Sequence, residues 1–255
     1  MSATELLAGA GGSIKLIDEQ ILTASGNWTK VAAVKPTDRV IVEMWSGGGS
    51  GAKTGNAEAV GGGQGGNFIQ LEFFAYQLGS SVPCVIGAGG AAVSATNNLD
   101  GNPGGASSFA GFSIPGGAGG KRVPGGLLQA STDIATVTNL IPSIQPINDP
   151  PTLALVANEL LKFESGGFSY GSFSGAYVRA ANRLYAGGCG GSFAAGQWPP
   201  SASAFGGAGG AGALSGSATS GAIPAGGGGA LATQTGNTGA GARGEIRVRV
   251  LRGAS

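Results

Sequence analysis

The run from Gly47 to Thr54 has the residue types of a phosphate-binding loop. It follows the apolar run 40–45 and matches the spacing G-x-x-x-x-G-K-[ST], in which backbone amides and the lysine hold phosphate groups. Two features depart from this chemistry. The second required glycine is Ala52, and the next residues, TGNAEAVGGGQGG, do not favour the helix whose N-terminus completes such a site. The sequence therefore argues against ATP or GTP binding.

Two further motifs have the spacing of known sites without their structural context. Gly87, Gly89 and Ala92 match the dinucleotide pattern G-x-G-x-x-A, but no helix pattern follows and no alternating strand and helix units surround it. Residues 171–176, GSFSGA, place Phe173 where the nucleophile elbow G-x-S-x-G requires serine. We therefore predict neither dinucleotide binding nor serine hydrolase activity.

The chain contains no histidine. This excludes the Ser-His-Asp and Cys-His nucleophile systems and removes the commonest protein ligand for transition metals. The 13 acidic residues show no arrangement that identifies a glycosidase. We therefore predict that the protein is not an enzyme, that it uses no cofactor, and that it has no catalytic, cofactor-binding or metal-binding residues.

Glycine accounts for 53 of the 255 residues and is concentrated in two blocks. Residues 47–120 contain 22 glycines and residues 187–255 contain 21, whereas residues 121–186 contain six. Because glycine loses more backbone freedom on folding than any other residue, such blocks either stay disordered or bring backbones into close contact. A hydrophobic content of 42%, a charged content of 11% and a net charge of +1 favour a folded chain.

Alternating apolar and polar residues predict β-strands around the glycine blocks. In residues 38–45, for example, Val40, Val42 and Met44 alternate with more polar positions. The last strand must pair with residues far away in the sequence, so the middle of the chain must loop out and return. We expect strands within residues 13–24, 38–45, 67–76, 82–87, 107–117 and 245–251.

The glycine blocks often repeat with a spacing of three, as in Gly206, Gly209 and Gly212. Three residues per turn is the period of the extended left-handed polyproline-II helix, which has no internal hydrogen bonds. Glycine segments of this kind can pack side by side and exchange backbone hydrogen bonds, because no Cβ atom keeps them apart. Collagen is excluded, since the period is broken repeatedly and the chain has 12 prolines.

Residues 121–186 differ in composition from the glycine blocks, and we interpret them as an insertion. Within them, residues 150–163 predict a short α-helix, near residues 152–163, with Asp149 as its cap. Leu153, Val156, Leu160 and Phe163 would share one face of this helix. The predicted organisation is an N-terminal attachment segment (1–12), the first half of a glycine-rich domain (13–120), the insertion (121–186), and a second glycine block with the closing strand (187–255).

Composition also bears on partners and location. A net charge of +1 offers no basic face for nucleic acid, and no stretch of 18 residues is apolar enough to insert into a membrane. The N-terminus lacks the pattern of a signal peptide, so we expect synthesis and assembly in a cytoplasm. Cys84 and Cys189 lie one in each block, and we expect two buried thiols, although a disulfide between the blocks stays open.

The order of these elements resembles the glycine-rich domain of bacteriophage tail and tail-fibre tip proteins. The resemblance begins with GNWTK (26–30) and a strand that runs into glycine, DRVIVEMWSGGGSG (38–51). Four more elements follow in the same order as in that family. These are GGGQGGNFIQLEF (61–73), VPCVIGAGG (82–90), GGASSFAGF with GGAGG (104–120), and GAGARGEIRVRV (239–250).

The resemblance implies a mainly β fold. It would be an antiparallel β-sandwich-like core with packed polyglycine-II helices, interrupted here by the inserted segment and its short α-helix. It further implies a virion protein of the tail or fibre, assembled in the bacterial host cytoplasm among other tail or fibre proteins. Related tip proteins recognise a host surface glycan or an outer-membrane protein. A homo-oligomer is expected, with a trimer favoured as in many phage fibres.

The aromatic run from Phe168 to Trp198 supplies the candidate receptor or interface residues. Tyrosine and tryptophan offer a large contact area at low entropic cost, and sugar rings stack on aromatic faces. Arginines nearby would add hydrogen bonds. The candidates are Tyr170, Tyr177, Arg179, Arg183, Tyr185 and Trp198.

Other interpretations stay open at this point. The same aromatics could cap the core or seal a subunit interface, in which case the chain would be a purely structural virion protein of the tail or a capsid appendage. The predicted helix would then make oligomer contacts. An ice-binding protein of glycine-rich helices is a third class, which would need a flat face of small residues at every third position, and Phe, Trp, Lys and Arg interrupt that face.

Overall fold

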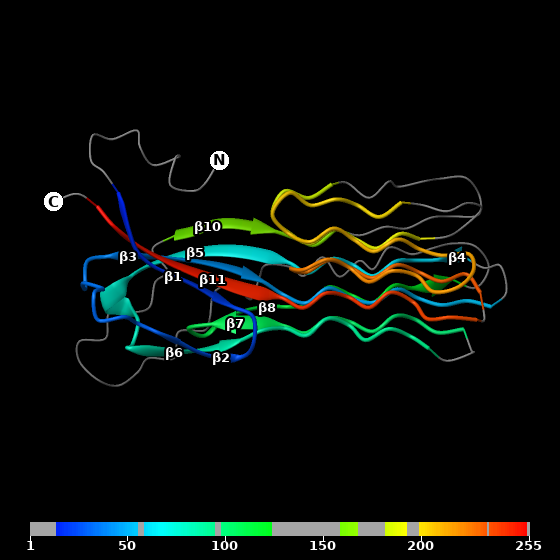
Figure 1. The fold of residues 1–255 in the computed structure, drawn as a ribbon, viewed down its shortest axis with the longest axis horizontal. Coiled ribbons are helices and arrows are strands. Elements are labelled where there is room, and N and C mark those ends of the chain that lie inside the picture. The colour runs from blue at the N-terminus through cyan, green and yellow to red at the C-terminus, as the bar shows by residue number, and fades with distance from the viewer. Residues whose placement is uncertain are drawn as a thin grey trace.

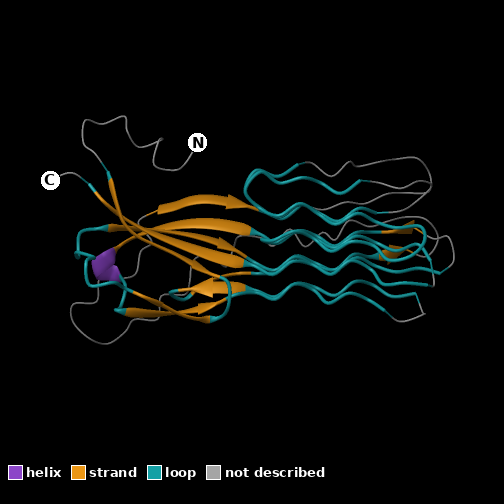
Figure 2. Ribbon diagram, in the orientation of Figure 1, coloured by secondary structure: helices purple, strands orange, loops and turns teal. Residues whose placement is uncertain are grey.

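Two antiparallel sheets, a short pair of strands and a set of extended glycine-rich segments make up the part of the protein that the structure describes (Figures 1 and 2). The computed structural model describes residues 14–55, 59–94, 98–123, 159–167, 182–192, 199–233 and 235–253. Within these ranges there is no α-helix, and none of the helical structure is long and apolar enough to span a membrane. The expectation of a mainly β fold is confirmed.

The larger sheet has five strands in the order β1-β11-β3-β5-β10. The closing strand β11 lies between β1 and β3, where Val248 pairs with Val42 and with Gln20. The expected non-local pairing is thus confirmed. The strands are β1 (Lys15–Leu22), β3 (Arg39–Trp45), β5 (Phe68–Phe74), β10 (Glu159–Glu164) and β11 (Glu245–Arg252).

The second sheet has four strands in the order β2-β6-β7-β8 and packs against the first. Its strands are β2 (Gly26–Thr29), β6 (Ser81–Val85), β7 (Ser107–Phe109) and β8 (Phe112–Ile114), and a 3-10 turn, η1 (Ala75–Gln77), follows β5. Alternate residues of both sheets meet in one core, as the β-strand period requires. The core includes Trp28, Val42, Met44, Leu71, Phe73, Cys84, Phe109, Ile114, Ile246 and Val248.

The predicted helix near 152–163 is wrong over the part that the structure describes. Residues 159–164 form β10, an outer strand that pairs antiparallel with β5. The free edge of β5 offers a row of backbone hydrogen-bonding groups, and pairing with it outweighs a local helical preference, which is a weak signal. The rest of the predicted helix lies outside the described residues.

Beyond the sheets, extended segments without strand pairing run side by side to the far end of the molecule (Figure 2). We call them the glycine array. A short pair of strands, β4 (Ala59–Val60) and β9 (Arg122–Val123), lies at its far end. The array consists of residues 46–54, 61–67, 86–94, 98–105, 115–121, 186–192, 206–213, 217–222, 225–231 and 237–244.

The hydrogen bonds of segment 46–54 repeat every three residues. Successive backbone N–H groups donate in turn to segment 61–67, to segment 98–105 and to segment 237–244. The donors and acceptors are Ser46 to Asn67, Gly47 to Gly105, Gly48 to Ala242, Gly49 to Gln64, Ser50 to Asn102, Gly51 to Gly239, Ala52 to Gly61 and Lys53 to Leu99. As donors, the buried amides from Ser46 to Lys53 are therefore bonded to three neighbouring segments, which satisfies them without a sheet.

The close packing of the array depends on glycine. A Cβ atom built on Gly51 would lie 2.0 Å from the carbonyl oxygen of Gly229, and one built on Gly63 would lie 2.0 Å from that of Gly49. Both distances are far below van der Waals contact. The blocks thus bring backbones together, and the alternative of disorder is excluded for the described segments.

Lys53, the lysine of the apparent phosphate-binding loop, is almost fully buried in the array. Its ammonium donates to the carbonyl oxygen of Gly236 at 2.6 Å, and the carbonyl oxygen of Ser94 lies 3.5 Å away. The segment before it is extended, with its amides bonded to neighbouring backbone. Lys53 therefore ties neighbouring parts of the chain together, and its segment is not shaped as a phosphate cradle.

The two cysteines are buried free thiols, as expected. Cys84 lies in the core between the sheets, and burial raises the pKa of its thiol. Cys189 lies in the array, where its amide donates to Ser201 Oγ at 2.8 Å. A disulfide between the blocks is not formed.

An ion pair between the buried Asp38 and the partly exposed Arg252 connects β11 to the turn before β3. Asp38 accepts hydrogen bonds from Arg252 Nε at 2.7 Å and Nη2 at 2.6 Å, and from the Lys35 amide at 2.7 Å. These bonds from Arg252 lower the pKa of Asp38, against the desolvation that raises it. The charged carboxylate therefore stabilises the folded state above the ordinary Asp pKa of 3.8, and this contribution is lost as the pH falls through the lower folded pKa.

We expect Asp38→Asn to destabilise the protein at pH 7 and to lose its effect on acidification. Urea unfolding of both proteins at pH 7, 5, 4 and 3 measures the difference in unfolding free energy. It should start to shrink below about pH 4, since the carboxylate of the unfolded wild-type chain then takes up a proton, and it should vanish once the pH has passed the lower folded pKa. A difference that stayed constant across this range would contradict the assignment.

Candidate functional site

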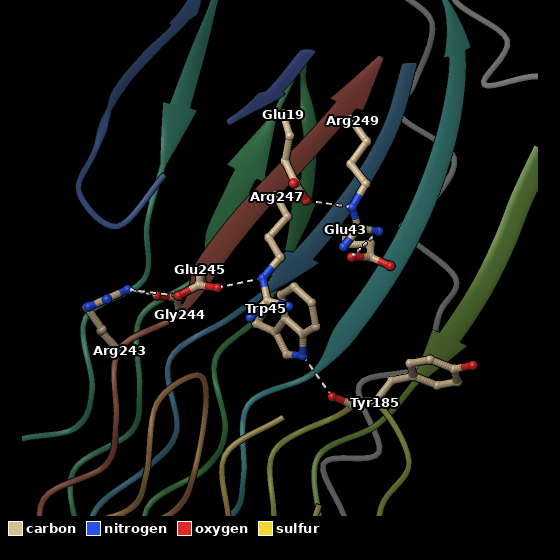
Figure 3. Close-up of polar contacts among 9 residues, drawn as sticks. All are labelled: Glu19, Glu43, Trp45, Tyr185, Arg243, Gly244, Glu245, Arg247 and Arg249. Carbon is tan, nitrogen blue, oxygen red and sulfur yellow. Dashed lines mark hydrogen bonds and ion pairs between the residues drawn. The ribbon is translucent and has the colours of Figure 1, made fainter. Parts of the chain in front are cut away.

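The outer face of the five-stranded sheet, turned away from the core, carries a ladder of paired charges (Figure 3). Arg249 contacts Glu19 at 2.8 Å and Glu43 at 3.2 Å. Arg247 contacts Glu245 at 2.8 Å, and Arg243 lies 3.8 Å from the same carboxylate. Each described arginine of this ladder thus meets a carboxylate, so the ladder holds little unbalanced charge.

Where this face meets the glycine array, four aromatic rings pack in sequence. We call Trp45, Phe68, Tyr185 and Phe205 the aromatic column. The ring centroids of Trp45 and Phe68 are 4.9 Å apart, those of Phe68 and Tyr185 5.1 Å, and those of Tyr185 and Phe205 5.2 Å. Trp45 and Phe68 are fully buried, whereas Phe205 is 48% exposed. The column therefore leads from a small buried cluster, separate from the core between the sheets, to the surface.

Tyr185 is held by several contacts within the chain. Its carbonyl oxygen accepts a hydrogen bond from Trp45 Nε1 at 2.7 Å (Figure 3), and its hydroxyl accepts one from Lys162 Nζ at 2.8 Å. The Lys162 ammonium is 4.5 Å from the ring centroid, so it lies at the hydroxyl edge of the ring. At the buried end of the column, the Arg247 guanidinium packs on Trp45, with Cζ 4.9 Å from the ring centroid.

Glu164, at the end of β10, positions the bend that carries Tyr185. Its carboxylate accepts hydrogen bonds from three successive amides: Leu184 at 3.2 Å, Tyr185 at 2.6 Å and Ala186 at 2.8 Å. Because Glu164 pairs with Phe68 across the sheet, its side chain is on the same face as the column. A charged acceptor with three donors makes this bend a well-determined part of the site.

Two of the six sequence-predicted site residues are described. Tyr185 lies in the aromatic column, and Arg183 lies beside it, where its backbone pairs with Ala202 and Ala204. The other four candidates, Tyr170, Tyr177, Arg179 and Trp198, lie outside the described residues. The structure thus brings Arg183 and Tyr185 to one place and does not test the other positions.

Sequence reasoning missed Lys162, Glu164 and Phe205. Lys162 and Glu164 were assigned to a helix or to its end, and this assignment does not place them on the same face of a sheet as Phe68. Phe205 stands alone in the glycine-rich stretch SASAFGGAGG, and a single large apolar residue in such a stretch is the signal that could have identified it. Among the described residues no group of three His, Cys, Asp or Glu side chains is placed to hold a metal ion.

The comparisons with known proteins bear on the first half of the chain. Residues 23–141 match the family model described as a glycine-rich domain. This glycine-rich domain covers β2 to β9 of the structure, including Trp45 and Phe68. The strands β1, β10 and β11, which complete the five-stranded sheet, lie outside the matched residues. A comparison with curated proteins found no match.

The two buried tryptophans of the glycine-rich domain allow a matched prediction. Trp45 donates to the carbonyl oxygen of Tyr185, whereas the buried Trp28 Nε1 has no partner in the described part of the chain. Trp45→Phe should therefore lower the unfolding free energy by about 1–3 kcal/mol more than Trp28→Phe, because it leaves a carbonyl without its donor. Urea denaturation of both variants measures this difference, and equal losses would contradict the role of the Trp45 bond.

Proposed function

We propose that this protein is a non-enzymatic component of a phage tail or tail fibre, and that it contributes to recognition of the host surface at the tip. The glycine array serves as a rigid scaffold, and the residues at its surface make the contacts. The order of sequence elements supports the phage assignment, and the match of residues 23–141 to a glycine-rich domain agrees with the scaffold. The proposed location is the virion tail or fibre, after assembly in the bacterial host cytoplasm.

The observation that carries the scaffold proposal is that the acceptor segment of the backbone hydrogen bonds from segment 46–54 repeats every three residues. Segment 225–231 supports it in the same way, since Gly227 and Ala230 donate to residues 188 and 191 while Gly228 and Leu231 donate to residues 49 and 52. We propose that these segments pack as polyglycine-II helices, whose period of three turns successive amides toward three neighbours. Such packing leaves few amides free and resists local opening.

The positions of β1 and β11, the first and last strands, support recognition at or beside the array. β1 begins and β11 ends at the end of the sheets opposite the glycine array (Figure 1). Attachment to other tail or fibre proteins at that end would leave the array projecting outward. We propose a host surface glycan or an outer-membrane protein as the receptor, no nucleic-acid partner, and a closed homo-oligomer with a trimer favoured.

A purely structural virion role is the second candidate, and one observation favours it. Tyr185, a candidate receptor residue, packs on the small buried cluster of Trp45, Phe68, Ala186 and Ala225 and has its polar groups engaged within the chain. In this case the aromatics hold the sheet and the array together, and the contacts of the chain are with other subunits alone.

Competition with phage adsorption separates the two candidates. Purified protein is incubated with bacteria that the phage infects, and the adsorption rate of intact particles is measured as protein concentration rises. Receptor recognition predicts that the protein binds the cells and slows adsorption, while heat-denatured protein does not. Saturating folded protein that neither binds the cells nor slows adsorption would overturn recognition and favour the structural role.

A further inference from the structure

Lys162 differs from the arginines on the same face of the sheet. Arg249 and Arg247 each contact a glutamate, and Arg39 is paired with Glu72. Lys162 is exposed, and among the described side chains it donates to the Tyr185 hydroxyl and forms no ion pair. The glutamate next to it on the same face, Glu164, binds backbone amides. A positive charge is therefore left available at the hydroxyl edge of the aromatic column.

Phe205 presents a ring of fixed orientation against the same tyrosine. It is 48% exposed, and its plane lies at 11° to that of Tyr185. Its backbone is fixed too, because its amide donates to the Leu184 carbonyl at 2.9 Å and the next amide donates to Ser203 Oγ at 2.9 Å. A ring that is ordered before binding costs little entropy when a ligand stacks on it.

Together these groups fit a ligand with one apolar ring face and one negative charge. A sugar ring offers a face of C–H groups to an aromatic ring, and a uronic or sialic acid adds a carboxylate at its edge. The Lys162 ammonium can meet that carboxylate through a charge-assisted hydrogen bond. Tyr185 contacts both groups, so the Phe205 ring and the ammonium lie within the span of one short oligosaccharide.

We propose that Phe205, Tyr185 and Lys162 form a binding site for an acidic oligosaccharide, with one sugar ring stacked on Phe205 and a carboxylate of the same oligosaccharide at Lys162. This inference names the ligand class of the proposed receptor-binding function and rests on it. Tyr185 supports both groups, and the bend fixed by Glu164 keeps it in position.

The test titrates the full chain with trigalacturonate and with trisialate, each next to its neutral methyl ester, by NMR and calorimetry. We expect the wild type to bind at least one acid about tenfold more tightly than its ester. Lys162→Gln should bring acid and ester to similar affinity, and Phe205→Ala should lower binding of both by tenfold or more. Leu214→Ala is the matched control, because Leu214 is similarly exposed, at 49%, in another turn of the array.

Absence of binding to both acids, or equal binding by wild type and the Lys162 and Phe205 variants, would overturn the site. The adsorption assay separates this failure from failure of the proposed function. If the two variants still slow adsorption as the wild type does, the receptor-binding function stands and this site is wrong. If the wild type binds an acidic saccharide and does not slow adsorption, the site stands and the host-recognition function is wrong.

Discussion

Gly51→Ala should destabilise the protein by about 3 kcal/mol or more, the upper range for overpacking a close-packed interior. The new Cβ would lie 2.0 Å from the Gly229 oxygen and 2.4 Å from its carbonyl carbon, and both contacts are backbone atoms that no side-chain rotation can move. Segment 225–231 would have to shift away from segment 46–54. That shift strains the bonds from Gly228 to Gly49 and from Leu231 to Ala52.

The measurement is thermal and urea unfolding of the variant beside Gly26→Ala. Gly26 is in β2, and a Cβ atom there would meet nothing within 4 Å. For a chain of this size the Gly51 variant should lose roughly 6–12 °C in Tm, whereas the Gly26 variant should change little. If Gly51→Ala were as stable as Gly26→Ala, the backbones would not be as close as the structure places them.

Glu164→Ala has the second-largest expected effect, about 3 kcal/mol. The substitution removes the acceptor of three amides, those of Leu184, Tyr185 and Ala186, and each lost hydrogen bond costs about 1 kcal/mol. Glu164→Gln should lose only about 1 kcal/mol, because its amide oxygen can keep the bonds from Tyr185 and Ala186, which share one carboxylate oxygen, while its NH2 group faces the Leu184 N–H.

Glu19→Ala is the control for Glu164→Ala. Glu19 is on the same outer face of the sheet, but it forms an exposed ion pair with Arg249, and such pairs contribute about 0–1 kcal/mol. Amide exchange should locate the loss, since in the Glu164 variant the amides of the 184–186 bend should exchange faster than those of β3. Equal stability of the two alanine variants would show that the Glu164 carboxylate does not hold the bend.

Local pattern predicted most of the sheets. The alternation of Val40, Val42 and Met44 survives in β3, because those residues face the core between the two sheets. β10 was missed for a physical reason. Leu160 and Phe163 fit a helical face as well as a strand, and only the presence of the free β5 edge decides between them.

The candidate site could be predicted only in part. Tyr185 was a candidate from the aromatic run, but its neighbours come from four separate stretches of the chain, in β3, β5, β10 and around Phe205. The contact of Tyr185 with Lys162 depends on β10, and its stacking with Phe205 depends on the alignment of residues 182–184 with 202–205. Glycine spacing predicts that segments pack closely but does not specify which segments become neighbours.

Amide hydrogen exchange of residues 47–53, followed by NMR, tests the central claim most directly. If the array is a packed scaffold, every amide in this run is bonded to a neighbouring backbone, and all seven should exchange as slowly as the core amides of β3. Exchange at the rates of an unstructured chain would contradict the packed array. Protection of every second amide alone would indicate an edge β-strand and would contradict the three-neighbour arrangement.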